Sequence, residues 1–339
     1  MADLTTSWLG LRLRSPLVVA AGPISRDPEA AAAAADAGVG AIVMHSLFEE
    51  QLIEDQMAAH RLIDGHTDTN AEARSFLPAA GVPSPDGGAY LAELARLRQR
   101  LEIPVVASLN GTTAGGWVKY AAKLADCGAS ALELNLYDVA TAAVESGAEV
   151  EMRQIELVGA VVSSVHIPVT LKLTPFHASL PAFVQRMEQV GVRGVTVFNR
   201  FYEPHIDLDA LEVRRAWMPS TSAELPLRLH ALAVLSTTSR LSLGCSGGVH
   251  CGEDAARAIL CGAHVVQVAS ALMKHGPAHI ATLRSGLSHW LDAKGYAASA
   301  EARGVLNLER APDPTAWTRM NYIRTLEGWS DRTSWRTRP

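Results

Sequence analysis

The sequence predicts an α/β fold: a (β/α)8 TIM barrel with an N-terminal hairpin and long loops after strands two and six. Short apolar runs recur along the chain, segments of helical character separate them, and a glycine-rich turn follows the seventh run. Because they are nearly continuous in valine, leucine, isoleucine and alanine, the runs are typical of parallel strands buried on both faces. Eight such units predict a closed barrel. The runs are Leu17–Ala21, Ala41–Met44, Val105–Leu109, Ala131–Asn135, Val169–Leu173, Gly194–Phe198, Leu241–Gly244 and His264–Val268.

Six helices are expected between the runs. Leucines at helical spacing mark the second of them. Four of the six end in a glycine that precedes a strand by one or two residues, namely Gly38, Gly128, Gly191 and Gly262. A glycine at this position ends a helix and releases the chain into the next strand. The expected ranges are 28–37, 88–101, 117–127, 150–165, 180–190 and 253–261.

The remaining segments complete the expected organisation. Residues 1–305 form the barrel domain, and residues 306–339 form a C-terminal tail that packs on it. Alternation around Gly10 in the segment from Trp8 to Leu13 predicts a hairpin that plugs the barrel bottom. The charged segment from Glu49 to Pro85 is expected to form a helix and a lid, because long loops without structure are uncommon unless they are functional.

Composition excludes several classes of function. The formal net charge is −5 and there is no long basic run, so we expect no nucleic-acid partner. We find neither an apolar stretch of ~18 residues nor a signal-peptide pattern, so we expect no membrane span and a cytoplasmic location. The four cysteines form no C-x-x-C pair, which argues against a metal site.

Residues at the ends of the predicted strands are candidates for the active site, because the carboxyl ends of barrel strands carry the catalytic residues. Glycines after strand seven let backbone N–H groups approach a phosphate. Two asparagines at strand ends suit a flat ligand with alternating donors and acceptors. The candidates are Ala21, Gly22, His45, Ser46, Asn110, Asn135, Lys172, Asn199, Ser246, Gly247, Gly248, Ala269 and Ser270.

Lys172 is the most informative single residue, since a lysine inside a buried strand needs a partner or a purpose. It holds positive charge against an anionic ligand, forms a Schiff base, or pairs with a carboxylate inside the barrel. Glu133 is a possible interior partner of Lys172 or of a backbone group, and Gln267 either orients the phosphate loops or satisfies backbone groups.

Together these residues resemble the dihydroorotate dehydrogenase family, most closely its bacterial dihydroorotate dehydrogenase-like branch. The resemblance rests on Lys172 and on the segments Leu9-Gly-Leu-Arg-Leu-Arg-Ser-Pro16, Ser46-Leu-Phe-Glu-Glu-Gln51, Ala107-Ser-Leu-Asn-Gly111, Leu132-Glu-Leu-Asn135, Phe198-Asn-Arg-Phe-Tyr202, Gly247-Gly-Val-His250 and Gln267-Val-Ala-Ser-Ala-Leu272.

The resemblance implies an FMN-binding barrel that moves a hydride between a CH–CH group of a small cyclic or carboxylate substrate and the flavin, in pyrimidine biosynthesis. Lys172 would lie near flavin N1. Asn135, Asn199 and His45 would face the substrate. The other residues implied to hold FMN are Ala21, Gly22, Ser46, Asn110, Asn135, Ser246, Gly247, Gly248, Gln267, Ala269 and Ser270.

One departure from the family pattern concerns the catalytic base. Members that oxidise dihydroorotate carry a cysteine or serine base after strand four, whereas this chain has Asn135-Leu-Tyr-Asp-Val-Ala140. Tyr137 or Asp138 would replace that base, and His45 stands where the family has a lysine. The alternatives are a Schiff-base lyase or aldolase that uses Lys172, and a catalytically silent flavin-binding partner subunit. The electron acceptor stays open, and a homodimer is expected.

Overall fold

The computed structural model of the chain describes residues 1–50, 87–111, 114–215 and 218–332. It confirms the predicted closed barrel of parallel strands, in which each strand pairs with the next and the last returns to the first. Every expected apolar run supplies one strand. In chain order the strands are β3 (Leu17–Val19), β4 (Ala41–Phe48), β5 (Val105–Asn110), β6 (Ala131–Asn135), β7 (Val169–Leu173), β8 (Gly194–Val197), β11 (Ser242–Ser246) and β12 (Val265–Val268).

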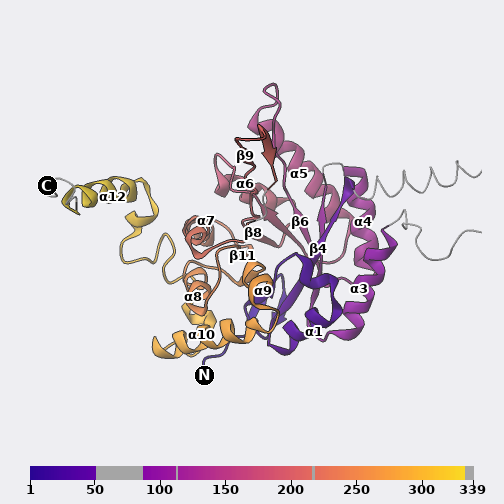
Figure 1. The fold of residues 1–339 in the computed structure, drawn as a ribbon, viewed down its shortest axis with the longest axis horizontal. Coiled ribbons are helices and arrows are strands. Elements are labelled where there is room, and N and C mark those ends of the chain that lie inside the picture. Colours follow the sequence, from indigo (N-terminus) through magenta and orange to yellow (C-terminus); the bar gives the residue numbers. More distant parts are fainter. Residues whose placement is uncertain (51–86, 112–113, 216–217, 333–339) are drawn as a thin grey trace, which may run out of the picture.

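Helices surround the barrel and cover the outer face of the strands (Figure 1). The six expected helices are present, and the four glycines that end helices all have positive φ, from 90° to 118°. Only glycine adopts this conformation without strain. The helices are α1 (Pro28–Asp36), α3 (Gly88–Arg100), α4 (Ala114–Asp126), α5 (Gly147–Ser164), α6 (Leu180–Gln189), α7 (Leu225–Thr238), α8 (Gly252–Leu260), α9 (Ser270–His275), α10 (His279–Ala293), α11 (Ser299–Ala302) and α12 (Arg319–Arg332).

The segment after the sixth barrel strand is more ordered than the sequence predicted. It contains a hairpin of β9 (His205–Asp207) and β10 (Glu212–Arg214), a short 3-10 turn at Ser222–Glu224, and the whole of α7. Helix α7 is mostly apolar along its length, including on its exposed side, where Leu227 is 52% exposed. An apolar helix without a polar stripe lacks the periodicity from which a helix is predicted.

The N-terminal hairpin of β1 (Thr6–Trp8) and β2 (Leu11–Leu13) closes the amino-terminal end of the barrel. Trp8 is fully buried and packs with Leu13 against inward residues of the strands, including Val43 and Val265. Gly194 lies under this hairpin, where an added Cβ would come 2.4 Å from Leu9. The plug therefore fills the interior that the strands leave open at this end.

The C-terminal tail begins near the barrel and leads away from it. A 3-10 turn at Pro314–Trp317 places Trp317 against His230 of α7. Helix α12 lies apart from the barrel in Figure 1, and it exposes apolar side chains that include Tyr322 and Leu326. The helix and lid were expected in 49–85, and residues 51–85 of that segment, together with Trp335 of the tail, lie outside the described residues. In the described part of the chain no helix combines the length and the apolar character needed to cross a membrane.

Candidate functional site

A cavity of about 480 Å³ opens at the carboxyl ends of the barrel strands. A narrower cavity of about 80 Å³ continues from it towards β11 and β12. The two have lining residues in common, so they lie side by side along the mouth of the barrel. The residues that line both are Ala21, Lys172, Asn199, Arg200 and Tyr202.

Most of the residues expected at the site line these cavities. Gly248 follows the lining residue Gly247 and is in the same turn, while Asp138 is not among the lining residues. The strands deliver these side chains because their carboxyl ends meet at one end of the barrel. The expected residues that line the site are Ala21, Gly22, His45, Ser46, Asn110, Asn135, Tyr137, Lys172, Asn199, Ser246, Gly247, Gln267, Ala269 and Ser270.

A hydrogen-bonded chain joins the two asparagines. Asn135 Nδ2 donates to Ser46 Oγ at 2.6 Å, and Asn199 Nδ2 donates to Asn135 Oδ1 at 3.2 Å. Ser46 Oγ also lies 2.9 Å from Ser108 Oγ. Asn135 is 3% exposed, so this chain fixes the orientation of its amide. The polar floor of the cavity is thus held rigid by three side chains from the neighbouring strands β4, β5 and β6 and by Asn199, which follows β8.

Lys172 lies at the junction of the two cavities and is 4% exposed. Its Nζ donates to Gln267 Oε1 at 3.2 Å and lies 3.7 Å from Glu133 Oε1. Gln267 Nε2 donates to Glu133 Oε2 at 2.6 Å. The interior carboxylate considered as a partner of Lys172 is therefore present. Gln267 instead bonds the side chains of Lys172 and Glu133, which the sequence did not predict, and Lys172 still lines the cavity.

The turn after β11 has the geometry of an anion-binding loop. Gly247 and Gly248 have φ of 89° and 79°, and a Cβ on Gly248 would lie 2.8 Å from Leu225 N. Buried Arg228 of α7 supports the turn from below, donating from Nε to the Ser246 carbonyl at 2.9 Å. Ser220 N donates to Ser270 Oγ at 2.9 Å, which joins this turn to the end of β12.

His45 has a carboxylate partner that sequence reasoning missed. Its Nδ1 lies 3.4 Å from Glu93 Oε1, and both side chains are largely buried. Tyr90 packs edge-on against the imidazole ring, and the His45 backbone N–H donates to Ser25 Oγ at 2.7 Å. Glu93 lies inside α3 rather than at a strand end, so no local pattern marked it.

The segment after β6 places its two candidate bases differently. Tyr137 lines the cavity and stacks on Phe201 with ring centroids 6.3 Å apart. The Asp138 carboxylate instead accepts a 2.6 Å hydrogen bond from Arg153 Nη2. Adjacent residues of an extended segment point to opposite sides, which explains why only one of the two faces the cavity.

The cavity is electropositive. The described residues that line the larger part include two arginines that sequence reasoning did not select, Arg26 and Arg200, together with Lys172 and His45, but no aspartate or glutamate. Arg200 follows Asn199 directly, so the rule on strand ends could have found it. A cavity with this charge favours an anionic ligand.

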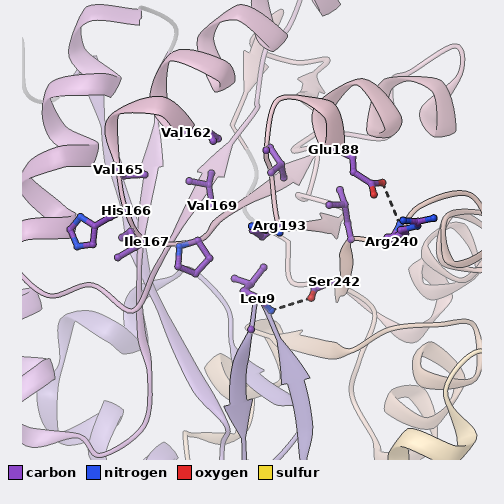
Figure 2. A pocket seen from close by; sticks show the side chains of 15 residues that line it. Leu9, Val162, Val165, His166, Ile167, Val169, Glu188, Arg193, Arg240 and Ser242 are labelled. Carbon is purple, nitrogen blue, oxygen red and sulfur yellow. Dashed lines mark hydrogen bonds between the residues drawn. The ribbon is translucent and has the colours of Figure 1, made fainter.

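A separate cavity of about 930 Å³ lies at the opposite end of the barrel. Figure 2 shows it beside the hairpin, where Leu9 N donates to Ser242 Oγ at 3.1 Å, and between the segments that enter β7, β8 and β11. Its arginines, Arg193 and Arg240, are exposed. Active sites of such barrels lie at the carboxyl end of the strands, so this cavity is not the catalytic candidate.

Comparison with known proteins agrees with this geometry. The family model described as "Dihydroorotate dehydrogenase" matches residues 3–291. A protein of Aeropyrum pernix named as a dihydroorotate dehydrogenase A (fumarate) is 28% identical over 303 residues, which are 87% of this chain and 94% of that protein.

Two relatives are named as catalytic subunits of dihydroorotate dehydrogenase B (NAD(+)). The Pyrococcus abyssi protein is 26% identical over 309 residues, 89% of this chain and 98% of its own length. The Methanosarcina mazei protein is 26% identical over 303 residues, covering 87% of this chain and 93% of its own. These matches confirm the resemblance expected from the sequence. The chain therefore belongs to the dihydroorotate dehydrogenase family and is a dehydrogenase-type oxidoreductase.

Proposed function

We propose that this protein is an FMN-dependent oxidoreductase that acts on a CH–CH bond of a small anionic substrate. The observation that carries the proposal is the position of Lys172, a buried cation between the broad cavity and the narrow cavity that ends at the Gly247–Gly248 turn. A flavin mononucleotide has the same division, a flat ring at one end and a phosphate at the other. A fixed cation near the ring favours the negative charge of the reduced flavin.

The residues present fit this cofactor. The phosphate would lie against the Gly247–Gly248 turn and Ser270, because positive φ at two successive glycines lets an anion approach the backbone closely. The Gly248 N–H donates to Ser220 Oγ at 3.3 Å, so Ser220 is part of the same turn. Added Cβ atoms would clash here, with Arg228 Nη2 at 2.9 Å from one on Gly247. The ring would lie between Ala21, Gly22 and Lys172. FMN, when bound, supplies the acceptor of the hydride.

His45 is the best candidate for the proton acceptor that replaces the absent cysteine or serine. Oxidation of a CH–CH bond to C=C removes a hydride from one carbon and a proton from the other. Glu93 Oε1 and Ser25 Oγ each lie 3.4 Å from Nδ1 and orient the imidazole, as in other acid–base pairs. Asp138 is engaged by Arg153 outside the cavity, so it is poorly placed for this role.

Arg26 and Arg200 would attract and orient the substrate. A guanidinium binds a carboxylate through two parallel hydrogen bonds, which fixes the orientation of a planar acid. Arg200 already contacts Glu224 at 3.2 Å, so Arg26 is the freer of the two for a bound anion. Asn135 and Asn199 would present amide groups to the substrate ring.

The proposal is tested by the visible absorbance of the purified protein, before and after anaerobic addition of dihydroorotate. We expect flavin bands that bleach on addition. Bands that persist would retain the cofactor but remove dihydroorotate as the substrate, and bands that respond to no reductant would indicate a silent partner subunit. No bands after reconstitution with FMN would overturn the proposal. Covalent trapping of a carbonyl compound on Lys172 by borohydride would then support a Schiff-base enzyme.

A further inference from the structure

We propose that Glu133 is a positioning residue that acts through Lys172 to lower the redox potential of the bound flavin. This inference rests on the proposed FMN site. It concerns a carboxylate that touches neither cavity, so it adds a residue that lies one layer below the reacting groups. The argument starts from how the barrel interior holds this side chain.

Glu133 lies in the middle of β6 and has no exposed surface. Its neighbours Leu132 and Leu134 belong to the hydrophobic core, while Glu133 and Asn135 lie on the other face of the strand and point into the barrel. β6 pairs in register with β7, with Asn135 opposite Lys172. The register thus puts the carboxylate one layer deeper than the lysine.

Two side chains, Gln267 and Lys172, contact the negative charge, and Thr196 accepts a hydrogen bond from the same Gln267 Nε2 that donates to Glu133. Gln267 donates to Glu133 Oε2 at 2.6 Å and accepts from Lys172 Nζ at 3.2 Å, so the amide bridges the carboxylate and the ammonium. Gln267 Nε2 also donates to Thr196 Oγ1 at 3.3 Å, which fixes the orientation of the amide. Lys172 is therefore held by two contacts from below, which direct its ammonium to one place at the cavity floor.

A purely structural role leaves one feature unexplained. Glu133 Oε1 has no hydrogen-bond donor among the described residues, although Lys172 Nζ is 3.7 Å away. A buried ion pair with incomplete hydrogen bonding contributes little to stability, and apolar residues of the same volume often serve the fold as well. The pair is better explained by an electrostatic effect on what binds above it.

The direction of that effect follows from charge. Lys172 alone would favour the reduced flavin, which carries more negative charge than the oxidised form. Glu133 offsets part of the lysine's charge in an interior where screening by water is weak. It therefore stabilises oxidised flavin relative to reduced flavin and lowers the potential. A cofactor held at a lower potential passes its electrons on more readily to an acceptor.

The test measures the redox potential of FMN in the full-length holoprotein and in Glu133→Gln, a neutral variant of the same shape. We expect the affinity ratio of reduced over oxidised FMN to rise at least tenfold, which corresponds to a rise of about 30 mV for a two-electron couple. Thr196→Val is the matched control. It removes a hydrogen bond from the same network without changing charge, and its ratio should change less than threefold.

Glu133→Met is a second variant that removes the charge in a side chain of similar length, and it should raise the potential in the same direction. An unchanged potential in folded Glu133→Gln, or an equal shift in Thr196→Val, would overturn the inference and leave the proposed function intact. Failure of both Glu133 variants to fold would also overturn it, because the carboxylate would then be a requirement of folding. Absence of flavin from the wild-type protein would overturn the proposed function and this inference together.

Discussion

At the scale of single residues, the site is defined by pairs rather than by isolated side chains. His45 has Glu93, Lys172 has Glu133, and Asp138 has Arg153. The first two pairs are buried at the barrel mouth and interior, and the third is near the surface. The low dielectric of the protein interior strengthens the buried pairs. An ion pair at the surface typically contributes only about 0–1 kcal/mol to the stability of the fold. The proposed chemistry therefore uses the buried pairs.

Replacement of His45 by glutamine should slow the reduction of FMN by dihydroorotate about 10²- to 10⁴-fold, the usual contribution of a general acid or base. The polar side chain should preserve the fold and the flavin spectrum. Stopped-flow absorbance measures the rate. Asp138→Asn is the control and should remain within about twofold of wild type, because its carboxylate is bound to Arg153. The reverse order of the two variants would assign the base to Asp138.

At the scale of elements, the strand ends and the turns that follow them build the site, and the helices behind them hold those turns in place. The turn after β11 depends on α7, since Arg228 donates to the Ser246 carbonyl at 2.9 Å and Leu225 N approaches Gly248. Helix α7, which was not predicted from the sequence, thus supports the glycine turn after β11, which was predicted. The hairpin β1–β2 closes the other end and touches neither cavity.

Gly247→Ala should weaken FMN binding about tenfold, or about 1.4 kcal/mol, while the barrel still folds. Alanine is strained at φ of 89°, and its Cβ would displace the Arg228 guanidinium. Fluorescence titration of FMN measures the affinity. Gly295→Ala is the matched control, since Gly295 has φ of 78° and nothing within 4 Å of an added Cβ. Equal losses of affinity in both variants would contradict a phosphate site at Gly247.

At the scale of the whole molecule, His264 links the last two strands of the barrel, β11 and β12. His264 precedes β12, and its Nδ1 accepts a 3.0 Å hydrogen bond from Leu243 N of β11. Burial, with a contribution from the nearby Arg303 charge, lowers the pKa of His264 to about 4. Protonation would remove the acceptor at Nδ1, so the folded barrel holds this imidazole neutral.

The lowered pKa predicts how global stability changes with pH. Between the ordinary histidine pKa near 6.5 and about 4, the unfolded chain binds a proton at His264 and the folded chain does not. The stabilisation of the fold that comes from a neutral His264 is fully present above pH 6.5 and is lost as the pH falls to about 4. The free energy of unfolding should change by on the order of 2 kcal/mol over this range. Urea unfolding at each pH measures it. His264→Asn keeps an acceptor without the titration and should flatten this dependence, and an equally steep profile in the variant would contradict the assignment.

Local patterns predicted much of this protein. Apolar runs marked all eight barrel strands, and the glycines at 38, 128, 191 and 262 marked helix ends, because both signals depend on residues a few positions apart. Strand ends named most of the cavity lining for the same reason. Helix α7 was missed since an apolar helix carries no amphipathic period. The helix and lid expected in 49–85, the packing of the tail and the homodimer remain predictions.

The sequence by itself determined the barrel, the family and the candidates at the strand ends, since each of these is written in short-range patterns or in motifs. Only the tertiary structure decided the partners. Glu93 reaches His45 across 48 positions, and Gln267 reaches Lys172 across 95. Such contacts form only when the barrel closes, because closure brings strands and helices that are distant in the sequence next to one another. Asp138 shows the same principle in reverse, because it adjoins Tyr137 in the chain yet points to Arg153 and away from the cavity.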